Sequence, residues 1–414
     1  MASTRNYPPG QGGRNGRAGR LRRRRNWAPH LPRRRWSRLA AVIVVAFMIP
    51  VTWSIGHALT MPGGGTFSER MAEWARSHYL NPVVTFGEWL TYSPPHKGGN
   101  PAFALGGPSA AALQTIACRK HHSTKPACRK HGQHGEAQSY GPPPRLKSFA
   151  GNPLPSEGVW RVLGAVQGKP AIYGTELRAS SVYSSYVAGI VSMNQKLVKF
   201  YLHPGAEDPG PGNWKSQTYI PPGARRGLLA TFNGGFRISV SGGGFYLNGA
   251  SMGTLTPGVA SVVYYRDGHI AIGVWDQTVR MTSQVVGVRQ NLHLIVTHDH
   301  VPASVDQGVN TTWGATLGGG YYVWRSGIGI SKDGHVIFVY GPELNVRELA
   351  DLLKRAGAVT AMQLDINPDW MSYMYYLHDM SARPKPINLL PNQMQQPNRY
   401  YSPANRDFTA VYAR

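Results

Sequence analysis

The segment Arg325–Asp365 constrains the fold of this chain more than any other part of its sequence. Its first half holds two apolar runs on either side of Asp333 and Gly334, a pair that predicts a tight β-hairpin in this setting. Asn345 is then placed to cap a helix, with Glu348 three residues later as its capping-box partner. The segment therefore predicts two antiparallel strands followed directly by a helix.

The second half of the segment predicts a buried strand that ends in an acid. Three leucines share one face of the predicted helix, and Gly357 ends it. Ala358–Leu364 follows as a short apolar run, and Asp365 comes directly after it. A carboxylate at the end of a central strand is costly to place unless it is hydrogen-bonded, paired or used. Asp365 is therefore the first candidate for a functional residue.

The chain from Val159 onward is rich in short runs typical of strands and contains only one well-signalled helix. This pattern predicts an α+β fold with a large mixed, mostly antiparallel sheet and a few packed helices. The predicted strands outside the segment are Val159–Val166, Ile172–Leu177, Tyr183–Met193, Leu197–Leu202, Ser261–Tyr265, Ile270–Trp275, Leu292–Val296 and Asp407–Tyr412.

Three blocks of sequence, in order, resemble the phosphodiester glycosidase family. The first is Thr231–Phe236, which reads Thr-Phe-Asn-Gly-Gly-Phe, followed by the glycine-rich Gly242–Gly249. The second is Arg325–Ile330 with its hairpin turn, and the third is the helix and strand that end at Asp365. The resemblance implies a phosphodiester glycosidase-like domain over residues 159–414. It further implies a hydrolase that cleaves a sugar 1-phosphodiester in an envelope or exported glycan, in a bacterial membrane-anchored member.

The resemblance also implies roles for individual residues. Asp365 would be the acid/base or the nucleophile, and Asn233 would orient the sugar, although Asn233 also fits an ordinary turn. Arg325 would hold phosphate oxygens bidentately, or it is a surface cation. The remaining implied substrate-binding residues are Gly234, Gly235, Tyr246, Asn367 and Trp370. The aromatic run that starts at Trp370 fits either stacking on a sugar face or core packing.

The loop after Asp365 departs from the family pattern. The family usually has two glycines and a serine here, whereas this chain has Ile366, Asn367 and Pro368. This replacement motivates a second hypothesis, a non-catalytic module of the same fold that binds an envelope glycan or phosphopolymer.

A glycosidase generally uses two carboxylates, and the second one is open in this sequence. A phosphate leaving group needs little protonation, so one carboxylate can suffice. The candidates for the second are Asp276, Asp306, Glu343 and Asp369.

The N-terminal region predicts a membrane anchor. Residues 1–38 contain 12 Arg and no acidic residue, so they account for half of the net charge of +24. The 21 residues of Leu39–Leu59 contain no Asp, Glu, Lys or Arg, which suits a bilayer span. The arginines would keep the N-terminus cytoplasmic and the C-terminal domain outside, with lipid contacted through Leu39–Leu59. A cleaved signal peptide is the alternative. Because the charge is concentrated in this tail, a nucleic-acid partner is not expected.

Residues 60–158 are expected to form a membrane-proximal stalk and a Pro-, Gly- and His-rich linker. Cys118 and Cys128 lie in a repeated Ala-Cys-Arg-Lys-His motif, which fits a disulfide or a zinc site. Outside the membrane a disulfide is favoured. His298 and His300 would share one side of a strand, but no third metal ligand is visible at a useful spacing. No cofactor is identified from the sequence, and a divalent metal stays open.

Overall fold

The computed structural model describes residues 33–60, 67–91, 93–107, 141–307, 312–314, 322–377 and 379–414. The chain divides into two compact units, Met1–Gly56 and His57–Arg414. Cys118 and Cys128, with their predicted disulfide, lie outside the described residues.

Helix α1 (Arg33–Thr60) contains the predicted apolar segment. The stretch Trp36–Thr60 has a mean hydropathy of 2.2 and is long and apolar enough to cross a membrane. A signal sequence near the N-terminus can meet the same criteria, so both interpretations of this helix remain. Two shorter helices follow in the chain, α2 (Phe67–Ser77) and α3 (Asn81–Thr91).

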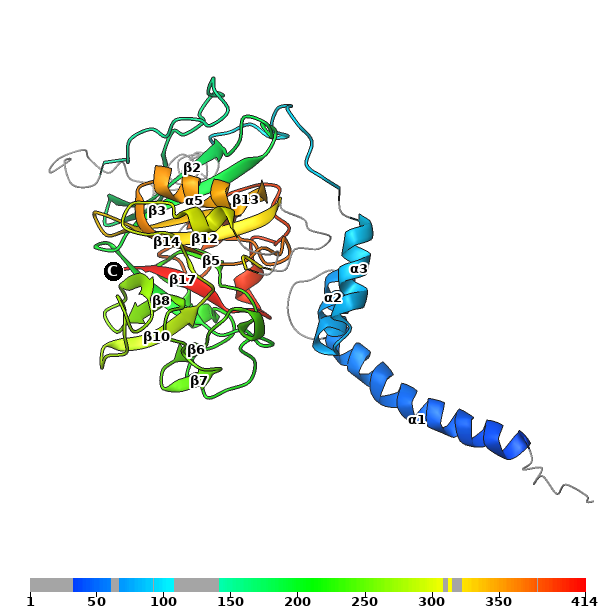
Figure 1. Cartoon of the computed structure of the whole chain (residues 1–414). Coiled ribbons are helices and arrows are strands. Elements are labelled where there is room, and N and C mark those ends of the chain that lie inside the picture. The colour runs from blue at the N-terminus through cyan, green and yellow to red at the C-terminus, as the bar shows by residue number, and fades with distance from the viewer. Residues whose placement is uncertain are drawn as a thin grey trace, which may run out of the picture. The chain divides into compact units, whose positions relative to one another are not determined.

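The C-terminal domain is built from three sheets, and all strand pairings among the described strands are antiparallel (Figure 1). The seven-stranded sheet has the order β1 (Arg161–Val166), β2 (Lys169–Arg178), β3 (Val187–Asn194), β13 (His335–Leu344), β12 (Val323–Ser331), β14 (Ala358–Gln363), β11 (Leu294–Val296). The first five-stranded sheet has the order β16 (Lys385–Asn388), β15 (Tyr373–Leu377), β5 (Leu228–Asn233), β17 (Phe408–Ala413), β4 (Val198–His203). The second has the order β7 (Ala250–Met252), β6 (Phe245–Leu247), β10 (Val285–Gln290), β8 (Ala260–Tyr265), β9 (Ile270–Val274). The predicted α+β class is confirmed, with three sheets in place of one large sheet.

The segment that most constrained the fold forms as predicted. Strands β12 and β13 pair around the turn at Gly334, whose φ of 79° is one that glycine adopts without strain. Helix α5 (Val346–Arg355) begins with a complete capping box. The Glu348 N–H donates to Asn345 Oδ1 at 2.7 Å, and the Asn345 N–H donates to Glu348 Oε2 at 3.2 Å.

Apolar side chains pack against both faces of the seven-stranded sheet. Alternation along β13 turns Ile337 and Val339 toward α5, where they pack with Leu349, Leu352 and Leu353. Phe338, on the opposite face, packs against the first five-stranded sheet. Its ring centroid lies 4.8 Å from that of Phe232 and 5.6 Å from that of Tyr373. The main core therefore lies between these two sheets.

Two stretches of the expected linker pack against the C-terminal domain. Glu157 is fully buried and pairs with Arg178 of β2, with 2.9 Å between Glu157 Oε2 and Arg178 Nη2. The Gly106 N–H donates to Glu176 Oε2 at 3.1 Å. A buried carboxylate is stable only when it is paired and hydrogen-bonded, so residues 141–158 are part of the folded domain.

Candidate active site

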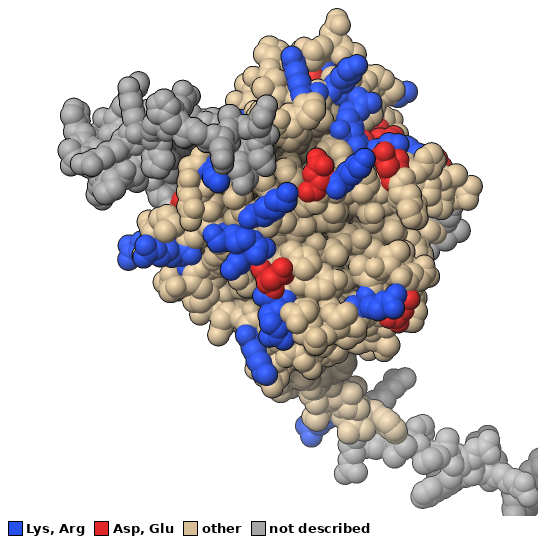
Figure 2. All heavy atoms as spheres, turned by 90° about the vertical axis from the view of Figure 1, so that its left-hand side faces the viewer, with Lys and Arg blue, Asp and Glu red and all other residues tan. Residues whose placement is uncertain are grey.

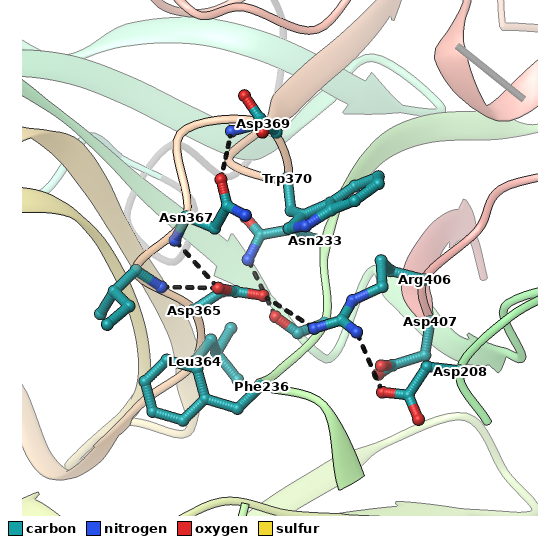
Figure 3. Close-up of polar contacts among 12 residues, drawn as sticks. Asp208, Asn233, Phe236, Leu364, Asp365, Asn367, Asp369, Trp370, Arg406 and Asp407 are labelled. Carbon is teal, nitrogen blue, oxygen red and sulfur yellow. Dashed lines mark hydrogen bonds and ion pairs between the residues drawn. The ribbon is translucent and has the colours of Figure 1, made fainter. Parts of the chain in front are cut away.

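Asp365 lies two residues after the last residue of β14. The carboxylate is buried, and Oδ1 accepts hydrogen bonds from the N–H groups of Ile366 at 2.7 Å and Asn367 at 3.0 Å (Figure 3). The other oxygen, Oδ2, lies 3.9 Å from Arg406 Nη2. These contacts fix the orientation of the carboxylate and leave Oδ2 on the side of Arg406.

Asn233 comes from the end of β5 and braces this region. Its Nδ2 donates to Gly234 O and to Ser326 Oγ, both at 2.9 Å, and its Oδ1 accepts from the Ser372 N–H at 3.2 Å. Ser326 Oγ also accepts from the Asp365 N–H at 3.2 Å. Asn233 thus links β5, β12 and the loop after β14, and the polar atoms of its side chain are engaged within the protein.

The glycine pair after Asn233 is required by a buried ion pair. Arg289 Nε donates to Asp407 Oδ2 at 3.0 Å, and both side chains are almost wholly buried. A Cβ on Gly234 would lie 2.0 Å from Asp407 Oδ2, and one on Gly235 would lie 3.2 Å from Arg289 Cζ. A side chain at Gly234 would therefore overlap buried Asp407, and one at Gly235 would crowd Arg289, so the backbone just after β5 passes close to the pair because it carries glycines.

Arg406 is the cation nearest to Asp365. Its Nη1 also lies 3.3 Å from Asp208 Oδ2, so it bridges the two carboxylates (Figure 3). The guanidinium carbon of Arg406 lies 5.7 Å from the ring centroid of Trp370, and that of Arg399 lies 6.0 Å from it. An indole face and two arginines therefore stand beside the buried carboxylate.

These groups line a small pocket. The volume that is open to the centres of water molecules is only about 10 Å³, so the pocket has room for about one water. The described residues that line it are Asn233, Gly234, Gly235, Asp365, Trp370, Gln395, Arg399, Tyr400, Ala404, Arg406 and Asp407.

The pKa of Asp365 reflects these surroundings. Burial raises the pKa of the Asp365 carboxyl from 3.8 to about 6, because the charged form loses its hydration. Arg406 is the largest opposing influence, followed by the two backbone N–H donors. A carboxyl that changes charge near neutral pH in a polar pocket is a candidate acid or base.

The predicted site residues differ in how they relate to this pocket. Asn233, Gly234, Gly235 and Trp370 line it with Asp365, and the roles that the resemblance implied for them stay predictions. Asn367 lies in the adjoining turn, where its N–H donates to Asp365 and its Oδ1 accepts from the Asp369 N–H at 3.0 Å. The aromatic run contains residues of both kinds: Trp370 lines the pocket, whereas the tyrosines of β15 are buried in the core.

Arg325 and Tyr246 are not among the described residues that line the pocket. Arg325 is neither at the pocket nor a surface cation. It is buried, and donates to Leu344 O at 2.8 Å and to Gln363 Oε1 at 2.8 Å. Its neighbour Ser326 faces Asp365, and side chains alternate along a strand, so Arg325 points away. Tyr246 packs in a separate apolar cluster of the second five-stranded sheet.

None of the four candidates for a second carboxylate lines the pocket. Asp306, for example, lies on the surface and pairs with Arg347. Among the described residues, Asp407 lines the pocket and Asp208 pairs with Arg406, and the sequence analysis selected neither acid. The only signal in the sequence was the position of Asp407 at the start of a predicted strand. His298 and His300 lie in an exposed turn, and no cluster of metal-binding side chains is found among the described residues.

The sequence can now be compared with known families. Residues 226–365 match the phosphodiester glycosidase family. The matched region begins just before β5 and ends at Asp365, so it includes Asn233, the glycine pair and the carboxylate. The resemblance seen in the sequence is thereby confirmed over these residues. The match to the phosphodiester glycosidase family supports a glycosidase-type function, although Arg406 and Asp407 lie beyond it.

Solved structures to which this chain is similar include the catalytic domain of the zebrafish N-acetylglucosamine-1-phosphodiester alpha-N-acetylglucosaminidase, auto-inhibited by its pro-peptide. That likeness has 15% identity, covers 62% of this chain and 88% of that chain, and has a TM-score of 0.38. A hypothetical protein from Synechocystis is 11% identical, with 60% and 63% of the two chains covered and a TM-score of 0.34. No curated protein matches the sequence.

Proposed function

We propose that this chain hydrolyses a sugar 1-phosphodiester in an envelope or exported glycan outside the cytoplasmic membrane. The observation that carries the proposal is the buried Asp365 carboxylate, whose pKa is raised to about 6, within the region that matches the phosphodiester glycosidase family. The apolar helix α1 supports a location at the membrane, either as an anchor or as a signal sequence.

Asp365 acts in its ionised form in this proposal. A phosphate leaving group needs little protonation, so the chemical demand falls on attack at the sugar carbon. Asp365 Oδ2 either attacks that carbon or takes a proton from a water that does.

Arg406 takes the phosphate-holding role that the sequence analysis gave to Arg325. A guanidinium presents a planar fork of donors that matches two phosphate oxygens. Arg406 stands beside Asp365, and Arg399 lines the same pocket, so both lie where a leaving phosphate would depart. Asn233 becomes a positioning residue, because its side chain bonds Ser326 and Ser372 of the protein itself.

A glycan- or phosphopolymer-binding module of the same fold is the second candidate function. The hydrogen bonds of Asp407, the other acid that lines the pocket, favour this second function. Both of its carboxylate oxygens accept hydrogen bonds from Arg289, at 3.0 and 3.2 Å. An acid held in this way is poorly suited to serve as a partner for Asp365.

The test is sugar release by the full chain in detergent from a panel of sugar 1-phosphodiesters, with Asp365→Asn measured alongside. Release by the wild type that is lost in Asp365→Asn supports the hydrolase. If no donor releases sugar and the folded protein still retains envelope glycans, the hydrolase proposal is refuted and the binding module is supported.

A further inference from the structure

A second cavity, the β4 groove, lies away from Asp365. It is an open groove of about 610 Å³ between the edge strand β4 and the sheet that contains β6, β8 and β10. This volume falls within the range of about 300 to 1,000 Å³ that is usual for ligand sites. The groove and the Asp365 pocket share no lining residue.

The β4 groove is basic. Lys199, Lys215 and Arg266 line it, and none of its described lining residues is Asp or Glu. Neither lysine forms an ion pair with a described residue. The face of the domain that carries the C-terminus in Figure 1 turns toward the viewer in Figure 2, where Lys and Arg outnumber Asp and Glu. A groove with one sign of charge favours a ligand of the opposite sign, here an anion.

Tyrosines are interleaved with these cations. Alternation along β4 puts Lys199 and Tyr201 on the same face, and Tyr412 of β17 lies opposite Lys199 in the sheet. The Tyr201 side chain is 44% exposed, and its ring meets that of Tyr412 edge to face at 5.5 Å. Tyr265 lines the groove from the end of β8. An exposed ring with a polar hydroxyl suits a ligand that has an apolar face and hydroxyl groups, as a sugar has.

We propose that the β4 groove is a second binding site, which holds an anionic glycan chain while Asp365 acts on another part of the chain. Strand β17 connects the two places, because Asp407 precedes its first residue and lines the Asp365 pocket, whereas Tyr412 lines the groove. Five residues of extended strand separate them, or about 17 Å. The choice of a glycan among anionic ligands rests on the proposed function. The charge and the tyrosines of the groove stand independently of it.

The experiment measures binding of the full chain in detergent to dextran phosphate, with neutral dextran and an oligothymidylate as comparison probes. The double variant Lys199→Gln/Lys215→Gln removes two cations, and Tyr201→Ala removes the exposed ring. The matched control is Lys332→Gln/Lys385→Gln, which removes two exposed lysines elsewhere on the domain. Circular dichroism confirms that each variant is folded.

We expect the groove double variant to bind dextran phosphate about five- to tenfold more weakly, with a shallower dependence on salt. Tyr201→Ala should weaken dextran phosphate binding by about threefold or more, and the control variant should bind like the wild type. A chain whose binding of dextran phosphate is weakened by the groove variants, but which hydrolyses no donor, would overturn the proposed function alone. Equal binding by the groove and control variants would overturn the groove proposal. So would oligothymidylate binding as tight as that of dextran phosphate.

Discussion

Replacing Arg406 with Gln should raise the pH at which hydrolysis switches on. Burial raises the pKa of Asp365 to about 6, and Arg406 is the largest influence that holds it down. With 3.9 Å between Arg406 Nη2 and Asp365 Oδ2, the attraction is worth about 1 kcal/mol in water and about 4 kcal/mol at an effective dielectric constant of about 20. One pKa unit corresponds to about 1.4 kcal/mol, so the midpoint should move from about pH 6 to between about pH 7 and pH 9.

The assay is kcat/KM for the wild type and Arg406→Gln across about pH 5 to pH 10, because this quantity reports the ionisation of the free enzyme. If Asp365 acts as a carboxylate, activity rises with pH through the midpoint. Loss of phosphate binding lowers the plateau of Arg406→Gln, whereas loss of the nearby charge moves its midpoint. Arg383→Gln, which removes an exposed arginine, should leave both unchanged. A lowered plateau with an unmoved midpoint would refute the claim that Arg406 controls the charge of Asp365. A profile that falls through pH 6 would refute the ionised role.

Three further predictions concern stability. Gly234→Ala should lower the free energy of unfolding by about 3 kcal/mol, because its Cβ would overlap buried Asp407, and the melting temperature should fall by about 6 to 12 °C. The control Gly223→Ala, with nothing within 4 Å of its Cβ, should melt close to the wild type. Asp365→Asn should stabilise the fold above about pH 6, by up to about 3 kcal/mol in denaturant titrations, because a raised folded-state pKa means that the ionised carboxylate opposes folding. Below about pH 4 the carboxyl is protonated in both states, so no gain in stability is expected. An equal gain at both pH values would contradict this reasoning. Glu157→Ala should lower the free energy of unfolding by about 3 to 5 kcal/mol, because it leaves the buried Arg178 without its ion-pair partner. Asp306→Ala, which breaks an exposed ion pair, should lower it by less than about 1 kcal/mol. Similar losses for the two variants would show that residues 141–158 are not part of the domain core.

The sequence could predict those parts of the site that depend on local signals. The capping box at Asn345, the hairpin turn at Gly334 and the carboxylate at the end of an apolar strand all lie within one continuous segment. Turn and cap chemistry act over a few residues, so they can be read without knowledge of the fold. Asp365 was found in this way, and the family resemblance added Asn233 and the glycines.

The residues that the sequence could not supply depend on long-range register. Phe408 pairs with Asn233 in the sheet, and this register alone brings Asp407 beside Gly234. The choice between Arg325 and Ser326 likewise depends on which face of β12 meets the pocket. A shift of one residue exchanges the two faces of a strand, and local pattern gives no information on that choice when both faces are buried.

The position of β17 determines the order in which this domain can be completed during synthesis. This strand follows the other described strands along the chain, yet it lies between β4 and β5 and pairs with both. Until the ribosome has released residues 408–413, one edge of β4 and one edge of β5 lack a partner. Unpaired edges of this kind are sites of aggregation. A nascent chain therefore needs protection of β4 and β5 until β17 is available, and loss of residues 407–413 would remove both this strand and Asp407, the counter-ion of Arg289.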